Sequence, residues 1–378
     1  MQSKIFPFVV FLAVLLASSI RSDAANITWH DVRSLELEGK GWTDTKDYYD
    51  RLPARAESMV RPAVWNLSLD SAGMAVRFIT DATTISAKWT LREESLSMPH
   101  MPASGVSGLD LYVKEQGTWR WIGAGRPKAV TTQADLVKNL PAGEREYLLY
   151  LPLYNGVKSV EIGIPSDATF RSAPSRRHLK PIVFYGTSIL HGGCASRPGM
   201  AYPSIIGRKL NWPIINLGFS GNAKSEPELA QLLAELDPLV YLLDPLPNMD
   251  AASVRERIPS FVRTLRAAHP TTPIVLVESI SYTDGFLIES RRNRYTGSNT
   301  ALREVFNQLK KEKVGNLHYI PGNNLIGLDG EGTVDGTHPN DLGFLRMAEA
   351  ITPTLQKLVY PGLSVRQFPG RTAIPQGR

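Results

Sequence analysis

The chain has 378 residues, of which 43% are hydrophobic and 21% are charged, and its formal net charge is +6. This length suits two domains, and the composition excludes a disordered, collagen-like or coiled-coil protein. The basic residues are scattered rather than gathered into a stripe, so we expect no nucleic-acid partner. The single cysteine, Cys194, excludes an intramolecular disulfide and is expected to be a small buried residue.

The first 25 residues have the pattern of a secretory signal peptide. Lys4 precedes an apolar run over residues 5–20, and small and polar residues follow it. That order predicts cleavage near Ala24 or Ala25. The run is shorter than the roughly 20 residues of a membrane span, which disfavours an uncleaved anchor. We therefore expect a secreted or periplasmic protein with no stable membrane span after signal cleavage.

Residues 26–170 alternate apolar and polar side chains over short stretches rich in aromatic and β-branched residues. Such stretches, separated by Asp, Gly, Pro and Asn, predict β-strands at residues 75–80, 84–91, 109–113, 117–122, 146–151 and 157–163. No long helical pattern interrupts them, so we expect a β-sandwich (jelly-roll-like) domain. Residues 171–180 carry no periodic apolar pattern and are predicted to be a linker.

The pattern changes in residues 181–360. Nearly continuous apolar runs alternate with amphipathic helical segments, and the runs lie at residues 182–185, 214–217, 239–243 and 274–277. A capping-box pattern of Ser225 and Glu228 predicts the start of one helix. Strands buried on both faces and alternating with helices predict a parallel sheet in an α/β layer fold, with its reactive site at the carboxyl ends of the strands. Residues 361–378 are a predicted carboxyl-terminal tail.

Two motifs would place a nucleophile and a base at this edge of the sheet. Ser188 follows the first apolar run at a strand-to-helix turn, and Asp335 and His338 lie three positions apart before the last predicted helix. Serine needs a base to take its proton, and a carboxylate holds the histidine in the required tautomer. These residues form a candidate catalytic triad. Taken singly, a capping serine or a surface histidine would give the same patterns.

Two further loops could supply hydrogen-bond donors. Gly221 follows the second apolar run, and Asn248 follows the third. Acyl transfer needs donors aimed at the oxyanion of the tetrahedral intermediate, and losing one typically costs about 2.7–4 kcal/mol. The backbone N–H groups of Ser188 and Gly221, with the side-chain amide of Asn248, would form an oxyanion hole. Considered alone, a turn explains the glycine and a cap explains the asparagine.

Together these blocks resemble the SGNH (GDSL-like) hydrolase superfamily, whose four blocks centre on Ser, Gly, Asn and a DxxH histidine in that chain order. The resemblance spans about residues 181–360 and implies an SGNH-type parallel-sheet α/β/α hydrolase domain, with the matching residues Ser188, Gly221, Asn248, Asp335 and His338. The first block reads Gly-Thr-Ser-Ile rather than Gly-Asp-Ser-Leu, and Pro247 replaces the usual glycine before Asn248. Lipase activity therefore does not follow from the GDSL name.

A second likeness extends over nearly the whole mature chain. Residues 104–112 resemble the GxDLY stretch of an amino-terminal β-domain that precedes a GDSL-like domain in a group of bacterial exported hydrolases. This β-domain could bind polysaccharide, or it could be a structural partner that walls the pocket. The GxDLY stretch, with residues 98–100 before it, favours the second interpretation.

The resemblance implies a serine esterase that works through an acyl-enzyme, and many relatives of this build deacetylate carbohydrates. We therefore expect an acylated carbohydrate or another small ester as the substrate. A lipase or arylesterase of broader range is one alternative, and a non-catalytic glycan-binding protein that kept the fold is another. No cofactor and no metal are expected, because the histidines are dispersed and no HExxH or Cys/His cluster exists.

Polar residues near the strand ends are weaker candidates for substrate contacts: His191, Arg197, Glu278 and Arg291. Arg291 belongs to a segment over residues 279–299 that we expect to be a long loop. Long loops in compact domains tend to be functional or mobile. Its aromatic and arginine side chains could face a saccharide or simply solvent.

Overall fold

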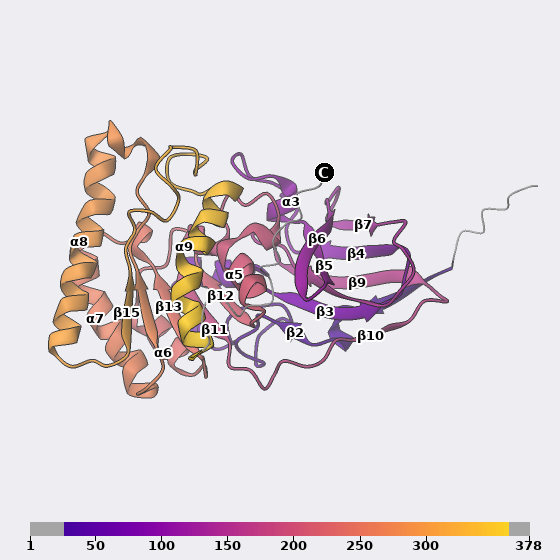
Figure 1. The fold of residues 1–378 in the computed structure, drawn as a ribbon, viewed down its shortest axis with the longest axis horizontal. Helices are drawn as coiled ribbons and strands as arrows, with labels where there is room; N and C mark the ends of the chain where they lie inside the picture. Colours follow the sequence, from indigo (N-terminus) through magenta and orange to yellow (C-terminus); the bar gives the residue numbers. More distant parts are fainter. Residues whose placement is uncertain (1–25, 363–378) are drawn as a thin grey trace, which may run out of the picture.

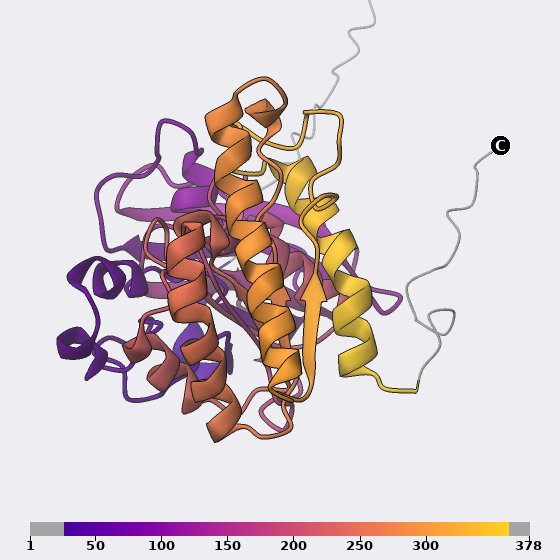
Figure 2. The ribbon, with the colours of Figure 1, turned by 90° about the vertical axis from the view of Figure 1, so that its left-hand side faces the viewer.

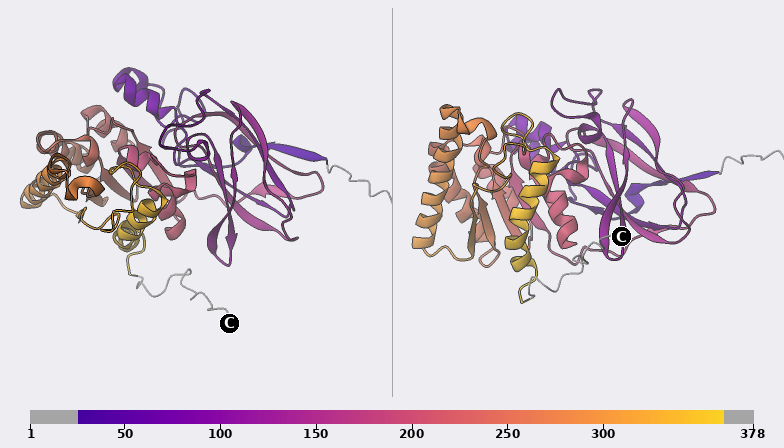
Figure 3. Two further views of the ribbon diagram at one scale, coloured as in Figure 1. Left: turned by 90° about the horizontal axis from the view of Figure 1, so that it is seen from above. Right: turned by 45° about the horizontal axis from the view of Figure 1, so that its top comes forward.

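The computed structural model describes residues 26–362, so the predicted signal peptide and most of the predicted tail lie outside the described residues. Figure 1 shows the antiparallel strands of the first half (indigo to magenta) beside the α/β layers of the second half (rose to yellow). Figure 3 shows the same two bodies from above and obliquely. The predicted fold class, a β-sandwich followed by a parallel-sheet α/β/α domain, is confirmed.

The amino-terminal domain consists of two antiparallel sheets packed face to face. The first has the order β1-β9-β4-β7, with β1 (Ile27–Asp31), β9 (Val157–Pro165), β4 (Ile85–Leu91) and β7 (Thr131–Val137). The second has the order β10-β3-β8-β5-β6, and β2 pairs with β3; its strands are β2 (Leu37–Glu38), β3 (Ala75–Thr80), β5 (Leu109–Glu115), β6 (Thr118–Gly125), β8 (Arg145–Tyr150) and β10 (Phe170–Ser172). Alternate side chains such as Phe78, Trp89 and Tyr147 fill the space between the sheets. The strand β10 extends into the stretch predicted as linker.

Short helical segments of the amino-terminal half were not foreseen. They are η1 (Val32–Ser34), α1 (Ala56–Met59), α2 (Pro62–Ser68) and α3 (Ala103–Val106). Pro62 opens α2, where its missing N–H costs nothing. Val64 and Trp65 of this helix are buried in the apolar core of the second domain. Helix α2 therefore packs the amino-terminal half against the second domain.

The second domain is built on a parallel sheet of order β12-β11-β13-β14-β15. Its strands are β11 (Ile182–Gly186), β12 (Ile214–Gly218), β13 (Val240–Asp244), β14 (Ile274–Val277) and β15 (Leu317–Ile320). The first four coincide with the predicted apolar runs. The strand β15 was missed, because His318 and Tyr319 are only half-buried at this sheet edge and interrupt the apolar pattern.

Helices cover both faces of the parallel sheet. On one face lie α6 (Pro227–Ala234), α7 (Ala251–Ala268) and α8 (Glu289–Lys311), and on the other α5 (Tyr202–Leu210) and α9 (Asp341–Val359). In Figure 2 the edge strand β15 is seen between α8 (orange) and α9 (yellow). The shorter segments are α4 (Ser188–His191), η2 (Pro198–Met200), η3 (Leu246–Asn248) and η4 (Thr283–Phe286). Among residues 26–362, no helix combines the length and apolarity that crossing a bilayer requires.

The predicted long loop over residues 279–299 is wrong from Glu289 onward, where α8 begins. The first turns of this helix are almost entirely polar, and its buried residues begin only at Ser298. A prediction that relies on an apolar stripe therefore cannot detect the first half of this helix. Similarly, the capping box at Ser225 does not form, because α6 begins at Pro227 and no side chain caps it.

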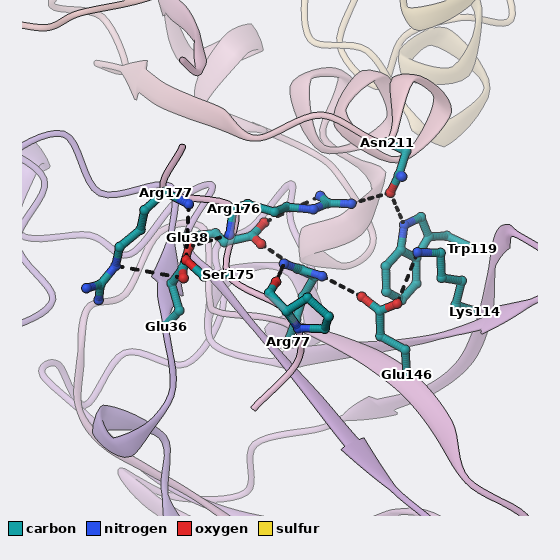
Figure 4. Close-up of polar contacts among 11 residues, drawn as sticks. Glu36, Glu38, Arg77, Lys114, Trp119, Glu146, Ser175, Arg176, Arg177 and Asn211 are labelled. Atoms are coloured by element: carbon teal, nitrogen blue, oxygen red, sulfur yellow. Dashed lines mark hydrogen bonds and ion pairs between the residues drawn. The ribbon is translucent and has the colours of Figure 1, made fainter. Parts of the chain in front are cut away.

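A cluster of polar side chains lies where the connecting segment leaves the sandwich, and Trp119 and Arg176 connect it to Asn211 of the second domain (Figure 4). Arg77, 6% exposed, bonds Glu38 and Glu146 at 2.5 Å each. Across the boundary, Trp119 Nε1 donates to Asn211 Oδ1 at 3.3 Å, and Arg176 donates to the same oxygen. Because Arg77 has two acidic partners, its burial leaves no unpaired charge, which would otherwise be strongly unfavourable.

The GxDLY stretch forms a second contact between the domains. The buried Asp110 carboxylate accepts from Arg197 Nη1 at 2.8 Å and from the Gly199 backbone N–H at 2.9 Å. Arg197 also donates to the Tyr112 hydroxyl at 2.5 Å and lies over the Trp121 ring at 5.1 Å. The predicted substrate contact of Arg197 is therefore corrected, because its guanidinium joins the domains instead.

Candidate active site

A tight strand-to-helix turn presents Ser188. The strand β11 ends at Gly186, where an added Cβ would lie 2.7 Å from the Asp244 carbonyl oxygen, so only glycine fits. The Thr187 side chain caps α4 by accepting from the Ile189 N–H at 3.3 Å. The hydroxyl of Ser188 therefore stands at the carboxyl edge of the sheet, at the amino terminus of a short helix.

The loop between β15 and α9 brings His338 and Asp335 to the same point. His338 Nε2 lies 2.8 Å from Ser188 Oγ, and His338 Nδ1 lies 2.7 Å from Asp335 Oδ2. The other carboxylate oxygen, Oδ1, accepts from the backbone N–H groups of His338 at 2.7 Å and Thr337 at 3.0 Å. Gly336 makes this turn possible with a φ of +82°, a conformation that side chains rarely adopt. The structure thus joins the three predicted residues in one hydrogen-bonded chain.

The charge on Asp335 determines how this chain works. Burial raises the pKa of Asp335, but hydrogen bonds from the backbone and ring of His338 and from the Thr337 backbone outweigh it and lower that pKa to about 2. An ionised carboxylate is an acceptor only, so it favours the tautomer with a proton on Nδ1. Nε2 is then free to accept the hydroxyl proton of Ser188.

The loops that carry the two predicted oxyanion donors follow β12 and β13, and the role of these donors stays a prediction. Gly221 has a φ of +68°, and an added Cβ would meet no atom within 4 Å. The carbonyl oxygen of the Asn248 side chain accepts from the Ala223 N–H at 3.3 Å. This contact orients the amide, and its NH₂ group has no hydrogen-bond partner within the described part of the chain. Such a free, oriented donor is what an oxyanion requires.

Two arginines from the amino-terminal domain hold the glycine loop, residues 218–222. Arg51, 1% exposed, donates to the carbonyl oxygens of Asn216 at 3.1 Å and Gly218 at 2.9 Å. Arg61 donates to the side chain of Asn222 at 2.7 Å and to its carbonyl at 2.9 Å. Sequence reasoning missed both arginines, because nothing local to residues 51 and 61 marks a contact more than 150 positions away.

A cleft beside Ser188 is lined by both domains. The amino-terminal domain contributes Ala63, Leu67, Met98, His100 and Tyr154, which face Ser188, His338 and the glycine loop. The Tyr154 hydroxyl donates to the Ser188 carbonyl oxygen at 3.2 Å. The structure therefore agrees with a β-domain that walls the pocket, although the sequence did not single out Tyr154.

Two predicted substrate contacts are wrong. His191 is fully buried; its Nε2 lies 2.6 Å from the Leu153 carbonyl oxygen, and its ring stacks on Tyr154 at 4.1 Å. Burial, aided by the charge of Arg51, lowers the pKa of His191 well below its usual value. Glu278, 3% exposed, accepts from Arg303 at 2.7 Å, from the Gly322 N–H at 2.8 Å and from Tyr319. Both side chains are structural, because they are buried and neither lines the cleft beside Ser188.

Arg291 contacts the turn that carries His338 rather than lining the cleft. Its Nε donates to the two carboxylate oxygens of Asp284 at 2.8 and 2.9 Å, and its Nη2 donates to Thr337 Oγ1 at 2.7 Å. The backbone of Thr283 also donates to the Gly336 carbonyl oxygen at 3.0 Å. Arg291, in the first turn of α8, and Thr283, before this helix, therefore clamp the turn between Asp335 and His338.

We expect Arg291→Met to lower kcat about tenfold with little change in KM, because small misplacement of a reacting group is costly. Steady-state kinetics on 4-nitrophenyl acetate, which gives kcat and KM separately, checks this prediction. Arg292→Met is the matched control, since Arg292 lies on the same helix but donates to the Gly285 carbonyl oxygen. A raised KM at unchanged kcat would instead restore the original prediction of a substrate contact.

Neither a second nucleophile nor a metal cluster accompanies this arrangement. Cys194 is buried, as expected, and burial raises the pKa of its thiol to about 12. Its thiolate, the reactive form, is therefore negligible at neutral pH. Over residues 26–362, no group of three or more His, Cys, Asp and Glu side chains could hold a metal ion.

Two family models match the chain. The GDSL-like Lipase/Acylhydrolase family matches residues 179–356, and the "N-terminus of Esterase_SGNH_hydro-type" matches residues 27–170. Among solved structures, a GDSL-like lipase from Bacteroides ovatus ATCC 8483 shares 41% sequence identity with this chain and superposes with a TM-score of 0.84. The match covers 88% of this chain and 98% of that one. The chain therefore belongs to the GDSL-like lipase/acylhydrolase family. It is accordingly a carboxylic ester hydrolase of the SGNH type.

More distant structures share the fold. The salicylyl-acyltransferase SsfX3 from a tetracycline biosynthetic pathway is 20% identical, with a TM-score of 0.69, covering 89% of this chain and 98% of its own. A family two carbohydrate esterase from Cellvibrio japonicus is 14% identical, with a TM-score of 0.57 and the same coverage of 89% and 98%. At these identities the likeness shows the fold alone. No curated protein matches the chain.

Proposed function

We propose that the protein is an exported serine esterase that removes small acyl groups, acetyl above all, from carbohydrates. The observation that carries the esterase chemistry is the chain from Ser188 Oγ to His338 Nε2 at 2.8 Å and from His338 Nδ1 to Asp335 at 2.7 Å. An intact chain of this geometry disfavours a non-catalytic glycan-binding role. The signal-peptide pattern in residues 1–25 supports export to the periplasm or beyond.

In the first half of the reaction, Ser188 Oγ attacks the ester carbonyl carbon while His338 Nε2 takes the hydroxyl proton. The carbonyl oxygen becomes an oxyanion that the N–H groups of Ser188 and Gly221 and the amide of Asn248 would stabilise. The bond from the carbonyl carbon to the alcohol oxygen then breaks, and His338 gives its proton to that oxygen. The alcohol leaves, and Ser188 carries the acyl group.

In the second half, water repeats the same steps in place of serine. His338 takes a proton from the water as its oxygen attacks the acyl carbon, and returns that proton to Ser188 Oγ as the acyl–serine bond breaks. The carboxylic acid leaves and the free enzyme is restored. No cofactor is needed, because every proton moves between His338, Ser188 and water.

Two features support a carbohydrate ester over a long-chain lipid ester. Polar side chains line part of the cleft, including His100, Tyr154, Ser220 and Asn222, beside the apolar side chains of Ala63, Leu67 and Met98. Sugar esters carry hydroxyl groups that such polar side chains can bind. The shared two-domain fold of the family two carbohydrate esterase from Cellvibrio japonicus agrees with this choice.

A lipase or arylesterase is the second candidate, because the 41% identical Bacteroides ovatus protein is described as a GDSL-like lipase. The carbohydrate assignment predicts that kcat/KM on 4-nitrophenyl acetate exceeds that on 4-nitrophenyl octanoate at least tenfold, whereas a lipase would use apolar lining such as Leu67 and Met98 to bind the added methylenes. Equal or better use of octanoate would favour the lipase.

Acetate release from a panel of acetylated plant and microbial polysaccharides then tests the carbohydrate assignment directly. We expect release from at least one member of the panel, measured by an enzymatic acetate assay, and none from chemically deacetylated samples. Hydrolysis of 4-nitrophenyl acetate without release from any polysaccharide would identify an arylesterase. Failure to hydrolyse any ester would support the non-catalytic alternative.

A further inference from the structure

A tight turn over residues 98–101 carries a second histidine into the cleft. The backbones of Met98 and Met101 exchange hydrogen bonds at 3.0 and 3.1 Å, which leaves Pro99 and His100 at the tip. Met101, 2% exposed, packs in the apolar core that includes Phe184 of the parallel sheet. The turn is therefore fixed to the α/β domain, although it belongs to the amino-terminal domain.

The imidazole of His100 is close to that of His338. Their ring centroids are 6.0 Å apart, and both side chains line the cleft with Ser188. His100 is exposed, and its ring makes no hydrogen bond to another residue in the described part of the chain. Met98 on the same turn adds an apolar surface beside it. A polar ring held by a fixed turn, without a protein partner, is available for a ligand.

The chemistry of the proposed reaction says which part of a substrate lies there. His338 must return its proton to the oxygen of the departing alcohol, so the alcohol has to sit beside the His338 ring. His100 lies beside that ring, at the same cleft. An imidazole can donate one hydrogen bond and accept another, which suits a hydroxyl group.

We propose that His100 binds a free hydroxyl of the leaving alcohol next to the esterified oxygen, so that the amino-terminal domain selects polyhydroxylated alcohols such as a pyranose ring. This inference rests on the proposed esterase function. A neutral hydrogen bond of this kind changes kcat/KM by roughly 2- to 12-fold. His100 is thus a specificity-determining residue, which separates it from the proton-transferring His338.

Two acetates that differ in the alcohol test this inference. A monoacetylated methyl β-xylopyranoside offers hydroxyl groups beside the ester, and cyclohexyl acetate offers the same acyl group on a ring without them. We expect His100→Ala to lower kcat/KM on the xyloside roughly 3- to 10-fold and to leave cyclohexyl acetate within twofold. His100→Gln, which keeps a donor and an acceptor, should recover most of the loss.

The matched control is His178→Ala, which removes another exposed histidine that does not line the cleft, and which should change neither rate. An equal loss on both acetates would overturn the proposal, because His100 would then act on His338 and not on the alcohol. No loss on the xyloside would overturn it as well. If the wild type cleaves 4-nitrophenyl acetate but has a lower kcat/KM on the xyloside than on cyclohexyl acetate, the proposed esterase function is kept and the proposed hydroxyl contact of His100 is rejected.

Discussion

Ser188→Ala is expected to lower kcat for 4-nitrophenyl acetate hydrolysis by about 10⁴- to 10⁶-fold, the range seen when a serine nucleophile is removed. Without Oγ no acyl-enzyme can form, and only the oxyanion donors and His338 remain to assist attack by water. Rapid-mixing measurements on the wild type should show a burst of 4-nitrophenolate, and the variant should show none. The melting temperature should barely change, since within residues 26–362 the only side-chain partner of Ser188 Oγ is His338.

Ser260→Ala is the control for this experiment. Its hydroxyl is exposed on α7, where it donates to the Arg257 carbonyl oxygen at 2.9 Å, and it does not line the cleft. This variant should keep full activity. If Ser188→Ala retained more than about one hundredth of the wild-type kcat, a nucleophile other than Ser188 would have to be sought.

Asp335→Asn is expected to lower kcat about 10⁴-fold, as in enzymes where this carboxylate orients the histidine. Asparagine can keep the backbone hydrogen bonds made at Oδ1, but its NH₂ group facing Nδ1 would favour the wrong tautomer of His338. The folded pKa of Asp335 is about 2, below its ordinary value of 3.8. The stabilisation from its charge is therefore present above about pH 4 and lost as the pH falls toward 2, outside the assay range.

Asp329→Asn is a matched control for that variant. Asp329 lies in the same loop, and hydrogen bonds led by that from Arg346 lower its pKa to about 2 as well, but it does not contact His338. We measure both variants by the same rapid-mixing assay with 4-nitrophenyl acetate, and we expect full activity from Asp329→Asn. Asp335→Asn activity above a tenth of the wild-type value would mean that another group orients His338.

Much of the fold and the centre of the site could be predicted, because both depend on local patterns. An apolar run followed by a glycine turn marks β11 and Ser188, and the three-residue spacing of Asp335 and His338 lets one turn hold both. The alternation of apolar side chains likewise marks most strands of the sandwich. Such signals are contained within about ten neighbouring residues.

The missed residues depend on contacts between distant parts of the chain. Nothing near Arg51 or Arg61 in sequence shows that the first is buried against β12 or that the second holds Asn222 of the glycine loop. The opposite error affected His191 and Glu278, which lie close to strand ends but point inward. Proximity in sequence to a reactive edge does not determine whether a side chain faces solvent or the interior.

The buried position of Arg51 has a practical consequence for protein engineering. Its guanidinium bonds carbonyl oxygens of β12, although it lies in the other domain, and burial lowers its pKa to about 10. A hydrolase module cut out at residue 181 would lose this support together with one side of its cleft. Chimeras that change substrate range should therefore exchange the first 170 residues with the second domain as one unit, and libraries should include the turn at residues 98–101.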